Sequence, residues 1–487
     1  MIPITERRYT MKKTRFFAML LTSFILLSFA ACGQTHGEPP TTTITTIDDV
    51  TTANTEEQLF DGLPVEDYNG YEFRVLQYRE SIGTATVLTE MTGDPIEDVI
   101  YERMLVVENR LHVTFSNRLE GHLESAALLQ KCIMAGMDEF DVAWLHSSNT
   151  VNQFLSQGYL MDLGQADGFD FQKPWWDDSA IQNLALDDHI YMAFGDVNIY
   201  LYDFHVALLF NKDLTDQNKL DLYTMVDEGT WTIEKFIEIT TNLALPSLDG
   251  NNDNAVLGYR GHTINMCGFI HGADVSLFNY DEEGIPSLES VNEPYLDVIT
   301  AYSNLFRDKT ICNTNDNYFV DNFASGKAVF IGTAIGRVQA LREAELAYGL
   351  IPFPKHDAAQ KEYISYMTSQ IQPTVIPKTN TDIDRTGVIL ENLSAESYRI
   401  VRPKYFQDLL ESKYVRDVKS MENMQMLFDC ETRFDIEDIY SWGELATTIR
   451  NALTGDSGRF VSSVEKQSRN INRNIESTLS YLNKGEQ

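Results

Sequence analysis

Cationic side chains are scarce in this sequence. Its 487 residues include 38 Lys and Arg but 72 Asp and Glu, which gives a formal net charge of −34 at pH 7. Without the first 31 residues the net charge is about −38. Nucleic-acid binding depends on cations that neutralise phosphates, and anionic membrane surfaces repel so acidic a chain. The composition therefore argues against a nucleic-acid partner, and attachment to a membrane would need a lipid or an apolar segment.

Cysteine is also rare, with five residues in the chain. Cys132, Cys267, Cys312 and Cys430 are widely spaced and form no CxxC pair, so neither a zinc site nor a disulfide framework is indicated. We expect buried free thiols at these positions, and one disulfide is the alternative for a protein outside the cell. HExxH, GxSxG and P-loop patterns are missing from the sequence as well.

One apolar run stands out near the N-terminus. Residues 16–31 (FFAMLLTSFILLSFAA) carry no charge and follow five Lys or Arg residues. The run is shorter than the roughly 20 residues of a membrane-spanning helix, which predicts a signal peptide over residues 1–31. The AACG stretch at 30–33 resembles a bacterial lipobox, with Phe29 where Leu is usual, and implies that Cys32 is lipidated. A plain signal peptide with an incidental cysteine is the alternative.

The next segment offers almost nothing that could build a core. Residues 35–55 contain nine threonines and two prolines, a composition typical of a solvated linker. We expect residues 32–65 to form a disordered tether between the lipid and a folded body. That body begins near Asp67.

The folded body opens with alternating strand and helix patterns. The predicted strands cover 71–78, 112–117 and 139–145, and the predicted helices cover 96–111 and 122–136. This alternation is the pattern of a mostly parallel sheet covered by helices. Ligands bind such sheets beyond the carboxyl ends of the strands, so the loops after Gln77 and Trp144 are candidate binding segments.

Two features of the later sequence predict helices. Thr230 or Thr232 can cap a helix that begins in GTWTIEKFIEI. The C-terminal segment carries apolar residues at helical spacing, which predicts one long amphipathic helix. These residues are Phe460, Val464, Ile471, Ile475, Leu479 and Leu482.

The stretch DGNNDN, which begins at Asp249, partly matches a calcium-binding loop. Asp249, Asn251 and Asp253 stand at positions 1, 3 and 5 of that pattern. Asn254 replaces the glycine of position 6, and Arg260 stands where the pattern needs a bidentate Glu. We therefore predict a solvated turn, no bound metal and no cofactor.

Several segments, in their order along the chain, resemble the extracellular solute-binding lipoproteins of bacterial ABC importers, specifically the sugar-binding group. They are KCIMAGMDEFDVAWLHSS, SQGYLMDLG, LDDHIYMAFGDV, LLFNKDL, GTWTIEKF, FASGKAVFIG, YGLIPFPK and IYSWGELATTIRNALTG. The resemblance implies an α/β fold of the two-lobed periplasmic-binding-protein type (type II), with a hinge and a ligand cleft between the lobes. It also implies three chain crossings, which we place near 196–205, 360–370 and 420–435.

These crossings divide the chain into lobes. We expect lobe 1 to contain residues 66–200 and 366–425, and lobe 2 to contain residues 201–365 and 426–487. Neither lobe is then one continuous segment.

A sugar site needs flat aromatic faces for the ring and short polar groups for the hydroxyls. Adjacent Trp175 and Trp176 cannot both point one way in a regular element, so we expect one in the core and the other exposed. We expect Trp231 at its helix start to pack in the core. The candidate ligand-binding residues are Trp144, His146, Trp176, Asn198, Tyr202, Asp203, Thr333, Tyr366 and Trp442.

The resemblance implies a function in carbohydrate import. We expect a monomer, not an enzyme, that is lipid-anchored at the extracellular face of the cytoplasmic membrane and delivers a mono- or oligosaccharide to ABC permease subunits. Two alternatives stay open at this point. One is a secreted glycoside hydrolase, which needs a pair of carboxylates, and the other is a sensor subunit that presents ligand to a receptor kinase.

Overall fold

The computed structural model describes most of the chain from residue 59 onward. The described ranges are 59–78, 86–147, 151–247, 255–281, 284–288, 290–368, 371–411, 416–434, 436–440, 442–455 and 457–482. The predicted signal peptide, Cys32, nearly all of the predicted linker and the DGNNDN stretch lie outside these ranges.

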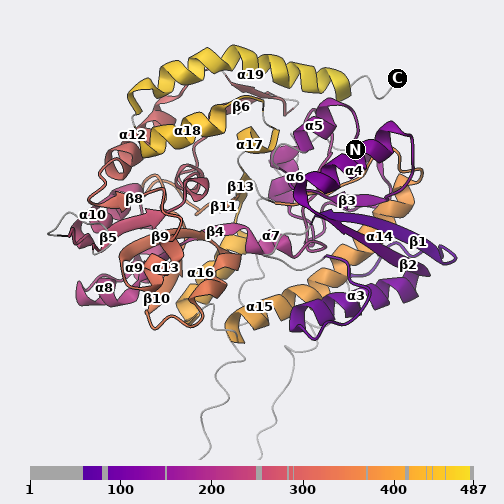
Figure 1. Ribbon diagram of the computed structural model, residues 1–487, viewed down its shortest axis with the longest axis horizontal. Coiled ribbons are helices and arrows are strands. Elements are labelled where there is room, and N and C mark those ends of the chain that lie inside the picture. The colour runs from indigo at the N-terminus through magenta and orange to yellow at the C-terminus, as the bar shows by residue number, and fades with distance from the viewer. Residues whose placement is uncertain are drawn as a thin grey trace, which may run out of the picture.

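Two sheets form the centres of two lobes, which lie on the right and the left of Figure 1. The first sheet has the order β12 (Thr374–Val375), β3 (Val142–Trp144), β1 (Tyr71–Tyr78), β2 (Val113–Glu120). β1 pairs in parallel with both β2 and β3, whereas β12 is antiparallel to β3. The parallel strands confirm the predicted alternation of strands and helices in this lobe.

The second sheet is larger and mixed. Its order is β13 (Thr432–Phe434), β11 (Ser365–Met367), β4 (His205–Asn211), β9 (Ala328–Ala334), β5 (Leu257–Gly261), β8 (Cys312–Asn313), with β10 (Tyr348–Ile351) also paired to β4. β4 is antiparallel to β9, β10 and β11. All seven residues of β4 are buried, as expected for a central strand.

Helices cover the sheets of both lobes. In the first lobe these are α3 (Pro95–Leu111), α4 (His122–Met134) and α14 (Ile383–Glu396). α3 begins where local chemistry favours a helix start, because Asp94 Oδ1 accepts bonds from the N–H groups of Ile96 and Glu97 and Pro95 follows directly. Short helices α5 (Val151–Ser156) and α6 (Asp178–Leu184) lie at the side of this lobe that faces the second.

The second lobe has helices of very different lengths. They include α8 (Lys212–Gln217), α10 (Ile233–Leu243), α12 (Glu293–Phe306), α13 (Phe319–Ala324), α16 (Val418–Asp429), α18 (Leu445–Thr454) and α19 (Phe460–Leu482). Thr232 caps α10 as predicted, since its side chain accepts a bond from the N–H of Lys235. The apolar face predicted for α19 is confirmed, with five of its six residues buried and Leu479 partly buried. Trp231 is fully buried, which confirms its packing role.

The chain passes between the sheets at three places. The first is α7 (Tyr200–Asp203), directly before β4, and the second lies between β11 and β12. The third lies between α15 (Arg402–Glu411), which packs on α3, and α16, which packs on β10. β11 and α16 therefore lie with the second sheet, although the sequence-based division placed most of their residues in lobe 1.

Three apolar clusters hold these elements. One fills the first lobe between its sheet and α14. A second lies at the crossings, where Ile100 of α3 and Leu209 of β4 belong to the same cluster. The third runs from α4 and α5 through α19 into the second lobe, so the lobes share apolar contacts on two sides.

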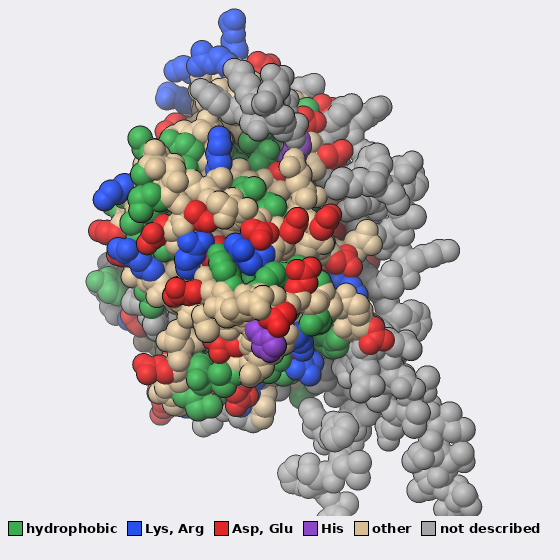
Figure 2. Space-filling model, turned by 90° about the vertical axis from the view of Figure 1, so that its right-hand side faces the viewer, with side chains coloured by type: hydrophobic (Ala, Val, Ile, Leu, Met, Phe, Trp, Pro, Cys, Tyr) green, Lys and Arg blue, Asp and Glu red, His purple; other side chains and the backbone are tan. Residues whose placement is uncertain are grey.

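All four cysteines that the structure describes are free thiols. Cys132, Cys267 and Cys312 are buried as predicted, whereas Cys430 is only half-buried. Within the described residues, no helix is both long and apolar enough to cross a membrane. Figure 2 shows one face of the first lobe, on which acidic and basic side chains are interspersed and hydrophobic ones are scattered.

Candidate binding site

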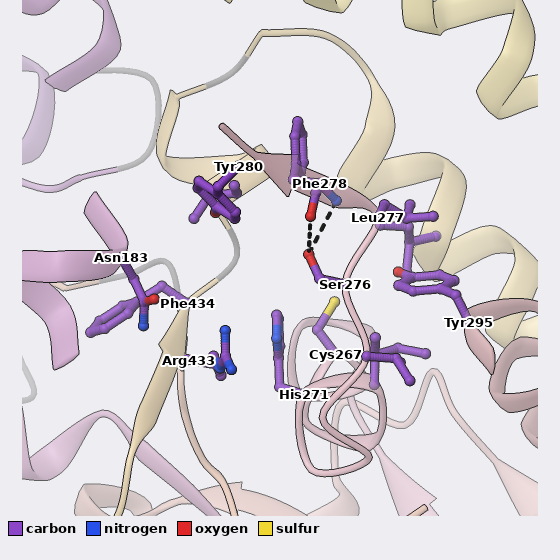
Figure 3. A pocket seen from close by; sticks show the side chains of 14 residues that line it. Asn183, Cys267, His271, Ser276, Leu277, Phe278, Tyr280, Tyr295, Arg433 and Phe434 are labelled. Atoms are coloured by element: carbon purple, nitrogen blue, oxygen red, sulfur yellow. Dashed lines mark hydrogen bonds between the residues drawn. The ribbon is translucent and has the colours of Figure 1, made fainter. Parts of the chain in front are cut away.

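A pocket lies where α6 of the first lobe meets the second lobe (Figure 3). α6 precedes the first crossing, and Nδ2 of its Asn183 donates to the carbonyl of Thr432 in β13 at 3.2 Å. The other walls come from α11 (Gly268–His271), the segment that leads into β6 (Phe278–Tyr280), and β13. Prominent side chains around the pocket are Asn183, His271, Phe278, Tyr280, Arg433 and Phe434.

The polar side of this pocket is built around Arg433. Its Nη2 pairs with Asp274 Oδ1 at 3.1 Å and with Glu431 Oε1 at 2.9 Å. Its Nε is buried and has no hydrogen-bond partner. His271 stacks on Tyr366, with ring centroids 5.0 Å apart and an angle of 13° between the planes. The pocket thus combines an unpaired donor with a charge that its own neighbours neutralise.

Aromatic rings form the other side. Phe434 contacts Phe194, which comes from the chain before the first crossing, at a centroid distance of 5.3 Å. Phe278 packs edge-on against Trp442, at 6.1 Å. Such rings supply flat apolar surface to a ligand.

The pocket is small in the described conformation. Its volume of about 40 Å³ exceeds the space of a single water molecule but is far below the roughly 300 Å³ of the smallest ordinary ligand pockets. A ligand larger than a few waters can enter only when the walls move. Asn183 of α6 is the one lining residue from the first lobe, and the others belong to the second lobe, so a separation of the lobes moves the α6 wall.

The carboxyl ends of the first sheet hold a second group of rings. Tyr78 ends β1, His146 follows β3, and His122 begins α4. The His122 and His146 ring centroids lie 4.4 Å apart, and Tyr78 lies 5.7 Å from His146. These residues occupy the edge at which parallel sheets bind ligands.

Buried charges gather at the first crossing. Arg402 Nη1 lies 3.7 Å from Asp196 Oδ2, and its Nη2 lies 3.3 Å from Asp429 Oδ1 on α16. Burial raises the pKa of Asp196 to about 7, with Arg402 acting in the opposite direction. Burial also raises the pKa of Asp203 to about 6, against the hydrogen bond that its Oδ1 accepts from Tyr405 at 2.8 Å. Arg402 therefore links the chain before the crossing to a helix of the second lobe.

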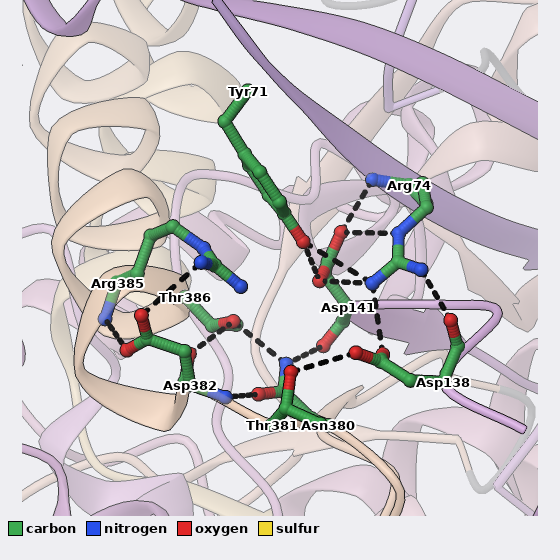
Figure 4. Close-up of polar contacts among 9 residues, drawn as sticks. All are labelled: Tyr71, Arg74, Asp138, Asp141, Asn380, Thr381, Asp382, Arg385 and Thr386. Atoms are coloured by element: carbon green, nitrogen blue, oxygen red, sulfur yellow. Dashed lines mark hydrogen bonds and ion pairs between the residues drawn. The ribbon is translucent and has the colours of Figure 1, made fainter. Parts of the chain in front are cut away.

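The opposite edge of the first sheet carries a polar network (Figure 4). Asp141, directly before β3, accepts bonds from the Tyr71 hydroxyl at 2.7 Å and from Arg74 Nη2 at 2.8 Å. The guanidinium of Arg385 lies 3.7 Å from the centre of the Tyr71 ring. Nδ2 of Asn380 donates to the carbonyl of Asp141 at 3.1 Å. The network joins β1, β3 and the start of α14 at the amino ends of the strands.

Comparison with known families decides the class of the protein. Residues 121–394, more than half of the chain, match the family model of bacterial extracellular solute-binding proteins. The chain belongs to this family. A comparison with curated proteins finds no match.

Solved structures of solute-binding proteins share the fold. UspC of M. tuberculosis matches with a TM-score of 0.55 and 14% identity, over 83% of this chain and 100% of that chain. The cyclic alpha-maltosyl-1,6-maltose binding protein of Arthrobacter globiformis matches with a TM-score of 0.55 and 12% identity, over 83% and 99%. The ABC substrate-binding protein Lmo0181 of Listeria monocytogenes, in complex with cycloalternan, matches at 0.51 and 14%, over 84% and 99%.

Two of the candidate residues lie at the end of β3 in this solute-binding protein. Trp144 is fully buried, and its Nε1 donates to Thr374 Oγ1 of β12 at 2.9 Å. His146 is 7% exposed and belongs to the ring group described above.

The expectation of one buried and one exposed tryptophan at 175 and 176 was wrong. Both are buried, and their indole N–H groups donate to the same carboxylate, Glu391, at 3.0 and 2.7 Å. The residues lie in a turn and not in a regular strand, so neighbouring side chains can point the same way. Burial raises the pKa of Glu391 to about 7, although both indoles act to lower it.

Three further candidates meet at the first crossing. Asn198 Nδ2 donates to the carbonyl of Gln372 in the second crossing, at 2.7 Å. The Tyr202 hydroxyl donates to Asp196, and the Asp203 carboxylate accepts from Tyr405. These contacts join the crossing segments to each other.

The remaining candidates lie in the second lobe. Thr333 is buried in β9 opposite Ala207. Tyr366 is buried beside the pocket through its stack on His271, and Trp442 lies behind Phe278. The candidates thus fall at four separate places, of which only the surroundings of Tyr366 and Trp442 adjoin the pocket.

None of the nine candidate residues lines the pocket itself, so sequence reasoning missed the whole lining. Asn183, His271, Tyr280 and Arg433 lie in short elements that carry no motif. A usable signal was the block CETRFDIEDIYSW, which concentrates one arginine and several rings next to Trp442. No group of three or more His, Cys, Asp or Glu residues suited to a metal ion occurs in the described part of the chain.

Proposed function

We propose that this solute-binding protein captures an uncharged mono- or oligosaccharide between its lobes and delivers it to the permease of an ABC importer. It acts as a monomer without catalysis, held at the extracellular face of the cytoplasmic membrane by a lipid on Cys32. The proposal adds three properties to the family assignment: a sugar as ligand, a lipid anchor on Cys32 and an ABC permease as partner.

The observation that carries the ligand class is the interlobe pocket. Phe278, Tyr280 and Phe434 offer ring surface, and Arg433 Nε offers an unpaired buried donor. Sugar rings need this combination, because their faces are apolar and their edges carry hydroxyls. Two structural neighbours bind cyclic sugars: Lmo0181 is in complex with cycloalternan, and the Arthrobacter protein is a cyclic alpha-maltosyl-1,6-maltose binding protein.

Charge supports an uncharged ligand. The guanidinium of Arg433 already pairs with two carboxylates, Asp274 and Glu431, so the pocket has no spare positive charge for an acidic sugar. The net charge of −34 on the chain also repels anions.

The sequence-based ligand residues and lobe boundaries form part of the proposal. We propose ligand contacts for Tyr366 and Trp442, which adjoin the pocket, and for His146 in the separate ring group at the end of β3. The candidates Trp144, Trp176, Asn198, Tyr202, Asp203 and Thr333 support the site through the contacts described above. We propose lobes built around the two sheets, with α15 in the first and α16 in the second.

A thermal-shift screen tests the ligand class. The panel contains maltotriose, mannotriose, raffinose and cellotriose as neutral sugars, and trigalacturonate as an acidic control. A ligand at 100 times its Kd adds about 2.7 kcal/mol to the free energy of unfolding, which raises Tm by about 1 °C or more for a chain of this size. We expect a shift with a neutral sugar and none with trigalacturonate. No shift with any neutral sugar up to 10 kDa dextrins, or a shift with trigalacturonate alone, would contradict the proposal.

The anchor has its own test. Replacing Cys32→Ser should release the protein from the membrane fraction into the medium or periplasm, because the lipid would have no attachment point. Mass spectrometry of the wild-type N-terminal peptide should show a diacylglycerol on Cys32. A membrane-bound C32S variant would show that another segment holds the protein.

A further inference from the structure

α19 contacts elements of both lobes (Figure 1). Its first half is fixed to the second lobe. Phe460 stacks on Tyr295 of α12, with centroids 5.9 Å apart and planes 9° apart. Asn472 exchanges two hydrogen bonds with the backbone of Leu288, at 2.8 and 2.9 Å. At a rise of about 1.5 Å per residue, the ten residues that follow Asn472 extend about 15 Å beyond this attachment point.

The second half of α19, residues 474–482, lies against the first lobe. α19 packs on α5, which precedes the first crossing. Ile475 and Leu482 are 2% and 6% exposed and belong to the same apolar cluster as Phe154 and Leu155 of α5. We refer to residues 474–482 as the strap.

The strap also holds the aromatic residue behind the pocket. Asn474 Nδ2 donates to the carbonyl of Trp442 at 2.6 Å, and Trp442 Nε1 donates to Thr478 Oγ1 at 3.2 Å. Trp442 stacks on Tyr440, with centroids 4.5 Å apart and planes 6° apart. The Tyr440 hydroxyl donates to the carbonyl of Leu184, at the end of α6, at 2.5 Å. A continuous set of contacts therefore runs from the strap through Trp442 and Tyr440 to the first lobe.

The lobes are joined differently on their two sides. At the crossings the chain itself connects them, together with the ion pairs of Arg402. On the strap side they are joined by side-chain contacts, by the Tyr440 bond and by the bond from Asn183 to the carbonyl of Thr432. A separation of the lobes that admits a ligand to the 40 Å³ pocket must therefore break the strap side and keep the crossings as the axis.

We propose that residues 474–482 form a strap that holds the lobes closed over the pocket and leaves α5 when the pocket opens. This inference rests on the proposed function only in taking the pocket as the ligand site. Ligand entry then depends on release of the strap. Release changes the surroundings of Trp442 and Tyr440, because the strap is hydrogen-bonded to Trp442 and Trp442 stacks on Tyr440.

Hydrogen exchange of the full-length, ligand-free protein tests the strap. The variants are Leu482→Ala and Ile475→Ala, and the matched control is Ser477→Ala, which changes an exposed residue of the same helix. In each core variant we expect exchange in α5 and in the strap to accelerate about 30-fold, the factor that corresponds to about 2 kcal/mol at 25 °C. Exchange should change less than about twofold in α14, whose apolar residues form a different cluster, and in α10, which lies at the far left of Figure 1, away from α5.

A milder variant guards against general unfolding. Thr478→Val keeps the shape of the side chain but removes the acceptor for Trp442 Nε1, so we expect a faster exchange of about fivefold in α5, α6 and β13 only. Unchanged protection of α5 in all three variants would show that the strap merely caps the second lobe. Equal acceleration in α5, α10 and α14 would show that α19 belongs to one common core. Either result overturns the inference, and neither depends on whether a sugar binds.

Discussion

The amino-terminal edge of the first sheet and the interlobe pocket use polar groups in opposite ways. At the amino ends of the strands, Asp141 accepts four bonds from Tyr71 and Arg74, and the carboxylate is buried and fully engaged (Figure 4). At the interlobe pocket, Arg433 keeps a buried Nε without a partner, and the rings of Phe278, Tyr280 and Phe434 line the pocket (Figure 3). A satisfied network adds stability and little else, whereas unpaired donors next to rings are what a ligand needs. The difference indicates that the network around Asp141 stabilises the fold and that the pocket around Arg433 binds the ligand.

Breaking the satisfied edge should give the largest effect. Asp141→Asn places an NH₂ group among four donors and leaves Arg74, which is 25% exposed, without its main partner. We expect a loss of about 2–3 kcal/mol in the free energy of unfolding, measured by urea denaturation. Asp138→Asn is the control, since Asp138 pairs with the same guanidinium but is 27% exposed, and should cost less than about 1 kcal/mol. Equal losses in the two variants would show that the network is not the source of stability.

Changing the pocket should alter binding instead of stability. Arg433→Gln removes a charge whose partners, Asp274 and Glu431, are more than 40% exposed, so unfolding should change by less than about 0.5 kcal/mol. The loss of the Nε donor should weaken binding of the sugar found in the thermal screen about tenfold, as measured by titration calorimetry. Arg118→Gln, which removes a similarly exposed ion pair on β2, should leave affinity unchanged. A wild-type affinity in R433Q would remove Arg433 from the site.

Asp196 at the first crossing should make the free energy of unfolding depend on pH. Burial raises the pKa of Asp196 to about 7, so between pH 4 and pH 7 the folded protein binds a proton that the unfolded chain releases. Stability from this group is present at pH 4 and is lost as the pH rises to 7. Asp196→Asn cannot titrate, and we expect it to gain about 1 kcal/mol relative to wild type between pH 5 and pH 7.5 in urea denaturation.

Other groups near the crossing set the background of that measurement. The pKa of Asp177 is raised to about 6 by burial, which gives the same sign, whereas burial lowers the pKa of His205 to about 3, which gives the opposite one. Asp177 and His205 are present in both D196N and the wild type, so the difference between the two proteins removes their contributions. Asp213→Asn, exposed on α8, is the control and should track wild type at both pH values. An identical pH profile for D196N would mean that Asp196 is ionised throughout.

Much of the first lobe could be predicted from sequence because its signals are local. The strand 71–78 coincides with β1. In the second lobe, the local apolar spacing of the last segment predicted the buried face of α19. Residues 112–117 and 139–145 predicted β2 and β3 with shifted ends, since strand ends depend on partners that sequence does not reveal.

The pocket could not be predicted in the same way. Arg433 lies near Asp274, and Tyr440 reaches Leu184, through contacts between segments more than 150 residues apart. The prediction that one of Trp175 and Trp176 is exposed was wrong because their common partner, Glu391, lies more than 200 residues away in the sequence. Single-residue reasoning weighs each ring alone, whereas the fold decides which rings share a partner.

The central claim is that the pocket between the lobes holds the ligand and the network at the opposite edge only holds the fold. Hydrogen exchange of the wild-type protein, with and without the sugar that shifts Tm most, tests this claim directly. We expect protection to rise in residues 267–280 and 431–434 and to stay the same in residues 71–74, 138–141 and 380–386. Protection confined to the second set, or spread equally over both, would contradict the account.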